Sequence, residues 1–333
     1  MKTELNRDIE AALQPLSARP ISHVFLVACG GSLSIMQGGK YFIDRHSTKL
    51  SSDIFNADDF VCRAPQRLGR NALVILCSQT GTTRETARAA QHAREKGALT
   101  VAMTLDPASP LAKASDFTVA YQASYTTGIA IDAADSNYAV LYMLLTGVLR
   151  ATDGIDLVAP VLTSLSALQP AIDRAHQVFA DRFADFAPHF KDKSAIYTLA
   201  SGPSYGAAYS FSTCVLMEMQ WYDSQAVHAN EFFHGPFEVV DKNAAFIVLI
   251  GSDETRRLAE RARDFLLRYG AESNILILDS AELDLSAIDA RFRGYVEPLV
   301  FFDTLWKFAY RLADLRRQPM LEGRRYMKKI SNY

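Results

Sequence analysis

The chain has 333 residues, which suffices for one large α/β domain or two ordinary ones, because single hydrophobic cores stop growing at about 250 to 300 residues. Its 35 basic and 37 acidic residues give a formal charge of 35 − 37 = −2, without the basic excess that binds nucleic acids or anionic membranes. No apolar run approaches the roughly 18 residues of a membrane span. We expect a soluble protein with two similar halves and neither nucleic acid nor membrane as a partner.

The cysteines and the first residues bear on the compartment. The first seven residues are polar and amphipathic, without the continuous apolar run of an export signal, so we expect the protein in the cytoplasm. Cys29, Cys62, Cys77 and Cys214 form no CxxC pair or Cys/His cluster, which disfavours structural zinc. Cys29 and Cys77 end apolar runs, where cysteine usually packs as a small apolar side chain.

Short apolar runs alternate with amphipathic stretches from the start of the chain. Residues 23–28, 72–77 and 99–104 are predicted strands, and residues 33–45 and 83–96 are predicted helices. This alternation predicts βαβ units and therefore a parallel sheet.

The same pattern restarts near residue 195. Strands are predicted at 195–200, 244–250 and 274–278, and helices at 205–219 and 254–269. The segment Ala-Cys-Gly-Gly-Ser at 28–32 returns as Ala-Ser-Gly-Pro-Ser at 200–204, an offset of 172 positions, which indicates an internal duplication. Coincidence between glycines at strand exits is the alternative.

Two further stretches read as helices. Residues 153–193 are compatible with a helical connector that packs between the halves, and its centre is the expected domain boundary. Residues 295–316 form an amphipathic helix with aromatic side chains at Phe301, Phe302, Trp306 and Tyr310. We interpret this helix as core or dimer surface rather than as a cofactor contact.

A hydroxyl-rich turn, Ser-Gln-Thr-Gly-Thr-Thr at 78–83, lies between a predicted strand and a predicted helix. Such a turn can bind a phosphate, because the N–H groups at a helix N-terminus point outward, the helix dipole adds positive character and hydroxyls donate hydrogen bonds. The turn lacks the GxxxxGK[ST] and GxGxxG patterns, so neither a nucleoside triphosphate nor a dinucleotide is indicated. Alternatively, Thr82 or Thr83 only caps the helix.

The turn with Gly30, Gly31 and Ser32 follows the first predicted strand. Parallel α/β sheets bind ligands outside the carboxyl ends of their strands, so this turn is a candidate for holding sugar hydroxyls beside the phosphate. A plain tight turn is the alternative.

Acid and base candidates gather in the second half only. Glu218 ends an otherwise apolar helix, where a carboxylate is costly to bury, and His234 is held in a turn by the Gly-Pro that follows it. The two form a candidate general acid and base pair. Structural roles remain open for both, as they do for His228, Glu231 and Glu238.

At these residues the chain resembles the SIS (sugar isomerase) family, and within it the fructosamine-6-phosphate deglycases. The segments that carry the resemblance are VFLVACGGS, LVILCSQTGTTRET, YTLASGPSYGAAYS, MEMQWYDSQAVHANEFFHGPFE and RRYMKK. The resemblance implies an α/β fold of two tandem SIS domains, each a parallel-sheet αβα sandwich of flavodoxin-like type. They would occupy residues 1–155 and 156–333, the second including the helical connector and the C-terminal tail.

The resemblance also implies roles for individual residues. Ser78, Gln79, Thr80 and Thr83 would bind the sugar phosphate, and Gly30, Gly31 and Ser32 would help to hold the sugar. Glu218 and His234 would be the catalytic pair, and Lys329 falls at the closest match to a lysine that contacts the sugar carbonyl in the more distant glucosamine-6-phosphate synthase. The family is dimeric, with sites completed across subunits, so we expect a homodimer or a higher homo-oligomer.

The implied reaction converts a fructosamine 6-phosphate into glucose 6-phosphate and a free amino acid. Every step is a proton transfer or an addition of water, which a carboxylate and an imidazole can perform without a metal or other cofactor. Two alternatives remain, an amino-sugar phosphate isomerase or deaminase and a sugar-phosphate-binding regulator. The regulator would usually carry a helix-turn-helix, for which the residues before the first strand are too few.

Overall fold

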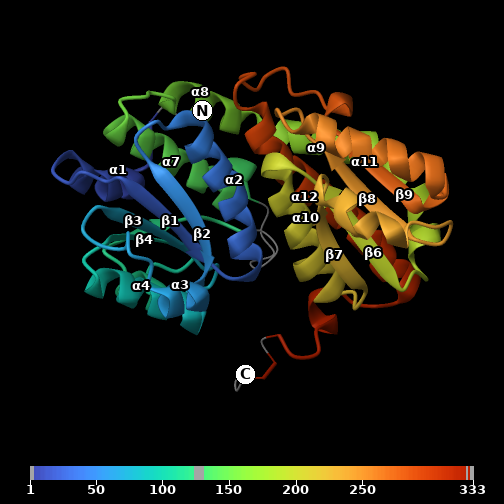
Figure 1. The fold of residues 1–333 in the computed structure, drawn as a ribbon, viewed down its shortest axis with the longest axis horizontal. Helices are drawn as coiled ribbons and strands as arrows, with labels where there is room; N and C mark the ends of the chain where they lie inside the picture. Colours follow the sequence, from blue (N-terminus) through green and yellow to red (C-terminus); the bar gives the residue numbers. More distant parts are fainter. Residues whose placement is uncertain (1–3, 124–130, 328, 331–333) are drawn as a thin grey trace. The chain divides into compact units, whose positions relative to one another are not determined.

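A computed structural model describes residues 4–123, 131–327 and 329–330 of the chain (Figure 1). The chain separates into two compact units, Met1–Gln169 and Pro170–Tyr333. Helix α8 (Val158–Ser166) therefore lies in the first unit, although it follows the boundary expected between residues 155 and 156. A hydrogen bond from the backbone N–H of Ala133 to the Gln169 side chain ties the end of this unit to its interior.

The first unit contains a five-stranded sheet with the order β2-β1-β3-β4-β5, and all its pairings are parallel. This is the flavodoxin-like order. The predicted strands and their parallel sheet are confirmed. The strands are β1 (His23–Ala28), β2 (Ser51–Asn56), β3 (Ala72–Cys77), β4 (Leu99–Thr104) and β5 (Phe117–Ala120).

Helices cover both faces of this sheet, because β1 and β3 are buried at every position, and apolar at all of them except His23 (Figure 1). Phe25 and Val27 face one core with α3 and α4, whereas Leu26 faces α2 and α7. The helices are α1 (Arg7–Leu13), α2 (Gly30–His46), α3 (Ala57–Arg63), α4 (Arg84–Glu95), α5 (Pro110–Ala114) and α7 (Asn137–Thr152).

The second unit repeats this plan with four parallel strands in the order β7-β6-β8-β9. The order matches β2-β1-β3-β4 of the first unit, and β6 begins 195 − 23 = 172 residues after β1, as the internal duplication predicts. The strands are β6 (Ala195–Ala200), β7 (Asp223–His228), β8 (Ala245–Ile250) and β9 (Ile275–Asp279).

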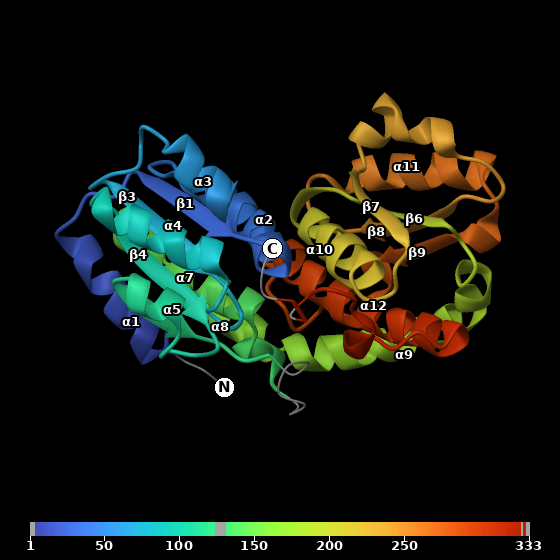
Figure 2. The ribbon, with the colours of Figure 1, turned by 90° about the horizontal axis from the view of Figure 1, so that it is seen from below.

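Figure 2 shows α11 (Arg256–Tyr269) on one face of the second sheet and α10 (Tyr205–Ser210) and α12 (Arg293–Arg316) on the other. Helix α9 (Leu168–Phe190) packs on α12 through contacts of Phe183 and Phe190 with Phe308. No helix in the described part of the chain is long and apolar enough to cross a membrane.

The single helix predicted at 205–219 is only partly correct. α10 ends at Ser210 and continues as a π-helix, Phe211–Met217. The backbone N–H of Glu218 donates to the carbonyl of Thr213, five residues earlier, instead of to the fourth residue back as in an α-helix. The additional residue in this turn changes the direction in which Glu218 leaves the helix.

Candidate active site

The hydroxyl-rich turn at 78–83 connects the carboxyl end of β3 to α4. The hydroxyl groups of Ser78 and Thr83 are 2.9 Å apart, and those of Thr80 and Thr82 are 2.7 Å apart. Thr83 occupies the N-cap position of α4, but its side chain makes no capping hydrogen bond there. Thr83 therefore does not have the capping role considered from the sequence, and the first N–H groups of α4 donate no hydrogen bond to its side chain.

Gly81 makes the turn possible. Its φ of +65° is in the left-handed region, and a Cβ at this position would come within 2.1 Å of the Ser109 hydroxyl oxygen. The Gly81 carbonyl accepts a hydrogen bond from the N–H of Leu111, and the Gln79 carbonyl accepts one from Leu105. The loop that follows β4 thus holds the turn in one conformation.

The turn after β1 lies beside the turn after β3, because Ala28 and Cys77 are paired at the ends of these neighbouring strands. Ser32 hydrogen-bonds to the Cys77 thiol, which joins the two turns. Burial raises the pKa of Cys77 to about 11, so this cysteine stays a neutral thiol at neutral pH. The structure thus brings Gly30, Gly31 and Ser32 next to the residues predicted to bind phosphate.

This position is the switch point of the first sheet. α2 leaves β1 on one face and α4 leaves β3 on the other, and α/β sheets bind ligands at the strand ends of such a position. Gly30 has a φ of +55°, and a Cβ placed there would have no atom within 4 Å. The protein therefore leaves the position of a side chain at Gly30 unfilled.

The equivalent place in the second unit is filled by the protein itself. Gly202 corresponds to Gly30 at the offset of 172 and has a φ of +54°, but a Cβ there would be 2.5 Å from a carboxylate oxygen of Asp253. The Thr255 hydroxyl donates to Asp253 at 2.6 Å, and the backbone N–H of Ser252 donates to Glu297 at 2.7 Å. Burial raises the pKa of Asp253, and it raises the pKa of Glu297 to about 7.

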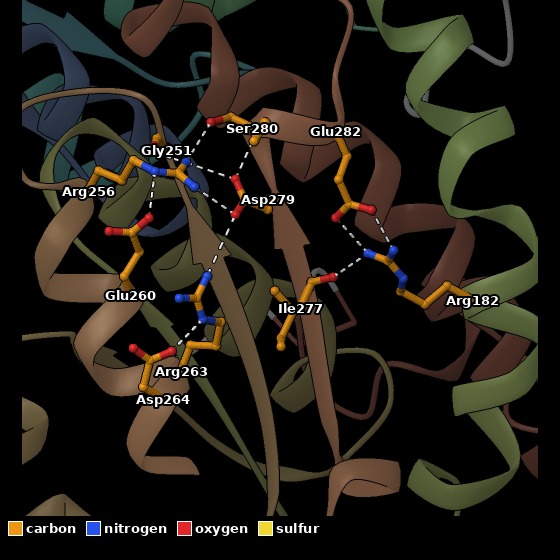
Figure 3. A network of polar contacts seen from close by, with 11 residues as sticks. Arg182, Gly251, Arg256, Glu260, Arg263, Asp264, Ile277, Asp279, Ser280 and Glu282 are labelled. Atoms are coloured by element: carbon orange, nitrogen blue, oxygen red, sulfur yellow. Dashed lines mark hydrogen bonds and ion pairs between the residues drawn. The ribbon is translucent and has the colours of Figure 1, made fainter. Parts of the chain in front are cut away.

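An ion-pair network closes the same edge of the second sheet (Figure 3). The Arg256 guanidinium donates to both carboxylate oxygens of Asp279 at 2.8 Å, to Glu260 at 2.8 Å and to the Gly251 carbonyl at 3.1 Å. Burial opposes ionisation of Asp279, but the hydrogen bonds from Arg256 and from the Ala281 N–H hold the pKa of this carboxylate below its ordinary value.

Glu218 lies between the π-helix and the start of β7, and its side chain is 21% exposed. Its carboxylate oxygen Oε1 is 2.6 Å from Nε of Arg324, in the segment that follows α12. The carboxylate predicted to act in catalysis is thus paired with an arginine that the sequence analysis did not select. The RRYM motif contains this arginine, but only Lys329 was considered from that end of the chain.

His234 ends a short 3₁₀ turn, Glu231–His234, just after β7, and its side chain is exposed. The aromatic residues around it are anchors, since Phe232, Phe233 and Phe237 all contact Phe265 of α11. They fix the turn while His234 stays accessible.

The structure does not bring Glu218 and His234 together within the second unit. Glu218 precedes β7 and His234 follows it, so the two residues lie beyond opposite ends of this strand. β7 has six residues, which separates its ends by about 16 Å at the usual rise per strand residue. The 16 positions between the two residues therefore span a whole strand.

The remaining candidates are also placed. Lys329 is exposed, and its ammonium group donates to the Glu322 carbonyl at 2.9 Å. His228 accepts a hydrogen bond at Nδ1 from the N–H of Asn230, and its ring lies 5.7 Å from that of Tyr205. Across residues 4–123, 131–327 and 329–330, no three His, Cys, Asp or Glu side chains gather as metal ligands would.

Comparisons with known proteins identify the class. The SIS domain model matches residues 19–147. A Bacillus subtilis crystal structure described as a phosphosugar isomerase superposes with a TM-score of 0.94 at 45% identity, covering 98% of both chains. A second such structure, from Salmonella typhimurium LT2, gives a TM-score of 0.91 at 34% identity and covers 100% of this chain and 99% of the other. The fold is that of a tandem SIS-domain protein.

Two curated relatives narrow this class. Fructosamine deglycase FrlB of Bacillus subtilis (strain 168) is 46% identical over 98% of both chains. Fructoselysine 6-phosphate deglycase of Escherichia coli (strain K12) is 27% identical over 96% of this chain and 89% of its own. The chain belongs to the SIS-domain family, in the group of the fructosamine deglycases.

Proposed function

We propose that this protein deglycates a fructosamine 6-phosphate, hydrolysing a carbon–nitrogen bond to release glucose 6-phosphate and a free amino acid. The observation that carries the proposal is an open, hydroxyl-rich switch point in a chain that is 46% identical over its full length to a fructosamine deglycase. We also propose that the enzyme works in the cytoplasm, where sugar phosphates are formed and used.

The phosphate group is assigned to the turn after β3. Ser78, Gln79, Thr80 and Thr83 supply hydroxyl and amide donors, and the N-terminus of the twelve-residue helix α4 supplies backbone N–H groups and the positive end of its dipole. Gly30, Gly31 and Ser32 hold the sugar hydroxyls in the neighbouring turn, and Lys329 contacts the sugar carbonyl.

The chemistry consists of proton transfers followed by addition of water. After ring opening, a base removes a proton from C1 to give an enaminol, and a proton returned to C2 gives an imine at C1. Water adds to this imine and the amine leaves, so one water molecule is consumed for each glucose 6-phosphate released. We assign the carbon proton transfers to Glu218 and the ring or carbonyl oxygen to His234, although these two roles could be exchanged.

The positions of this pair favour an assembly of several chains. Because Glu218 precedes β7 and His234 follows it, and the ends of this strand are about 16 Å apart, the geometry favours a site that takes the two residues from different copies of the second unit. We therefore propose a homodimer or a higher homo-oligomer in which Glu218 of one chain and His234 of another complete each site.

Mixing two inactive variants tests this arrangement. Glu218→Gln and His234→Ala are purified separately, then mixed, partly unfolded and reassembled. A mixed dimer contains one site with both native residues, so activity should return to a fraction of wild type. Reassembly of each variant alone is the control, and mixed dimers without activity would contradict the shared site.

The function itself is tested by coupled detection of glucose 6-phosphate across a panel of phosphorylated fructosyl-amino acids. At least one member should be turned over, and its unphosphorylated counterpart should not. Release of ammonia or fructose 6-phosphate from glucosamine 6-phosphate, without turnover of the panel, would instead support the isomerase or deaminase alternative.

A further inference from the structure

The C-terminal segment, residues 317–325, packs on the residues that carry Glu218. It begins where α12 ends at Arg317, whose φ of 53° turns the chain back. The Gln318 side chain donates to the Met219 carbonyl at 3.2 Å, and the Gln220 side chain donates to the Gln318 carbonyl at 3.1 Å. These two hydrogen bonds hold the C-terminal segment against Met219 and Gln220, the two residues that follow Glu218.

The same segment stabilises a strained residue close to Glu218. Trp221 has a φ of 58°, a left-handed conformation that is unfavourable for a bulky side chain and persists only where its surroundings impose it. The Arg325 guanidinium lies 3.8 Å from the centre of the Trp221 ring, and that of Arg316 lies 4.0 Å from the centre of the Tyr222 ring. The C-terminal segment and the end of α12 therefore determine the path of residues 218–222.

Within this arrangement Arg324 faces Glu218. The side chains are 18% and 21% exposed, and Nε lies 2.6 Å from Oε1. The contact is an ion pair more than a directed hydrogen bond, because the Nε–H does not point along this line. A guanidinium keeps its charge throughout the working pH range of a protein, and an adjacent positive charge favours the ionised form of a carboxylate.

We infer that Arg324 is a positioning residue, which keeps Glu218 ionised and in one orientation for proton transfer, and that the C-terminal segment exists to place it. This inference rests on the proposed function, which gives Glu218 its role. Contacts at this stretch include two other charged groups, Arg316 beside the titratable Tyr222 and Arg325 beside Trp221. Burial raises the pKa of Tyr222 to about 12, so it stays neutral.

The test compares kcat/KM against pH for Arg324→Gln, Arg324→Lys and wild type. Loss of the arginine charge should move the acidic limb of the pH profile, where kcat/KM falls as the carboxylate is protonated, upward by about one pH unit or more. An opposite charge at this range shifts the pKa of a carboxylate by that amount. Activity of Arg324→Gln should thus be at least tenfold low near the acidic limb and recover partly at higher pH. Arg324→Lys keeps the charge and should restore the position of the limb, with a lower kcat because it lacks the planar fork.

Arg325→Gln is the matched control, because it removes a neighbouring positive charge and the contact with Trp221 but leaves the ion pair. The acidic limb of its pH profile should stay at the wild-type position, whatever change in kcat follows from the lost contact with Trp221, and circular dichroism should show that all variants fold. An unmoved limb in Arg324→Gln, or a kcat above wild type, would overturn the inference, the second result indicating a latch that restrains Glu218.

Failure of the proposed function would look different. If Glu218→Gln retains wild-type turnover, Glu218 is not the base and the inference falls with that assignment. If Glu218→Gln is inactive while Arg324→Gln has the wild-type pH profile, only the role of Arg324 is wrong.

Discussion

The two units place the same turn in two different states. Gly30 and Gly202 occupy equivalent positions with almost the same φ. A Cβ at Gly30 would have no atom within 4 Å, whereas a Cβ at Gly202 would lie 2.5 Å from the Asp253 carboxylate. In the first unit, β3 is followed by the hydroxyl-bearing turn that contains Ser78 and Thr83. In the second unit, β8 is followed by Ser252, which donates to Glu297, and by Asp253. A duplicated fold thus supplies two switch points, and the side chains decide which of them can accept an anion.

The charges at the two switch points decide how each would interact with a phosphate. A phosphate at the second switch point would face two carboxylates and would have to displace the hydrogen bonds that Thr255 and Ser252 donate to them. A phosphate at the first would meet hydroxyls and a helix N-terminus. This difference supports the proposal that the phosphate binds in the first unit, while the second supplies the acid–base residues Glu218 and His234.

The largest expected effect tests whether the second unit supplies the acid–base residues while the first binds the substrate. Glu218→Gln keeps the size and hydrogen-bonding capacity of the side chain but removes its basicity, so kcat should fall by about 10²- to 10⁴-fold while substrate binding persists. Steady-state kinetics and a binding titration measure the two quantities. His234→Ala should lose kcat to a similar extent.

Glu231→Gln is the control for this change and should be milder. A Glu218→Gln enzyme with wild-type turnover would remove the assignment and move the base role to Glu231 or Glu238.

The next largest effect concerns the carboxylate that fills the second switch point. The pKa of Glu297 is about 7 in the folded protein against an ordinary value of 4.5, so the folded state holds its proton more tightly than the unfolded chain. Its contribution to stability is complete below pH 4.5 and is lost as pH rises through about 7, on the order of 3 kcal/mol in all. Glu297→Gln should therefore gain stability relative to wild type as pH rises from about 5 to 8.

Denaturant unfolding followed by tryptophan fluorescence measures this difference, because Trp221 and Trp306, the two tryptophans of the chain, are both in the second unit. A stability difference between variant and wild type that stays constant over this pH range would show that Glu297 titrates normally.

Removing the hydroxyls of the first switch point should have a smaller effect. The double variant Ser78→Ala/Thr83→Ala should lose about 1 to 3 kcal/mol in kcat/KM through lost hydrogen bonds to an anion, with the fold intact. Thr255→Ala, in the equivalent turn of the second unit, is the matched variant. It should lower the stability reported by tryptophan fluorescence and leave KM unchanged, and an equal effect of both changes on KM would end the distinction between the turns.

The smallest effect concerns the ion-pair network of the second unit. Arg256→Lys removes the paired hydrogen bonds to Asp279 and should cost about 1 kcal/mol of stability, since the pair is only partly exposed. Arg88→Lys changes an exposed pair with Asp58 in the first unit and should leave the tryptophan transition unchanged. A shift of equal size in both variants would show that the probe does not separate the units.

The sequence predicts the central strands well because they are almost entirely apolar, as in β3, β8 and, apart from His23, β1. It does not reveal β2 and β7, which lie at sheet edges and mix exposed with buried positions, so their polar residues resemble loops. The missed β7 also explains why Glu218 and His234 seemed close, since 16 residues of loop can fold back whereas a strand cannot.

The hydroxyl-rich turn at 78–83, to which we assign the phosphate, can be predicted from local pattern alone. Hydroxyls and a glycine between a strand and a helix define it within six residues. The pairing of Glu218 with Arg324 joins positions 106 residues apart and depends on the path of the chain after α12, which no local pattern specifies. The filling of the second switch point depends likewise on Glu297, 45 residues from the Ser252 that it binds.

Binding of glucose 6-phosphate, the proposed product, tests the comparison most directly. Isothermal titration calorimetry of the intact protein should give one site per chain, and Ser78→Ala/Thr83→Ala should weaken binding by about 1 to 3 kcal/mol whereas Thr255→Ala should leave it unchanged. Two equivalents per chain, or binding unaffected by the double change in the first unit, would contradict the assignment of the phosphate site to the first unit alone.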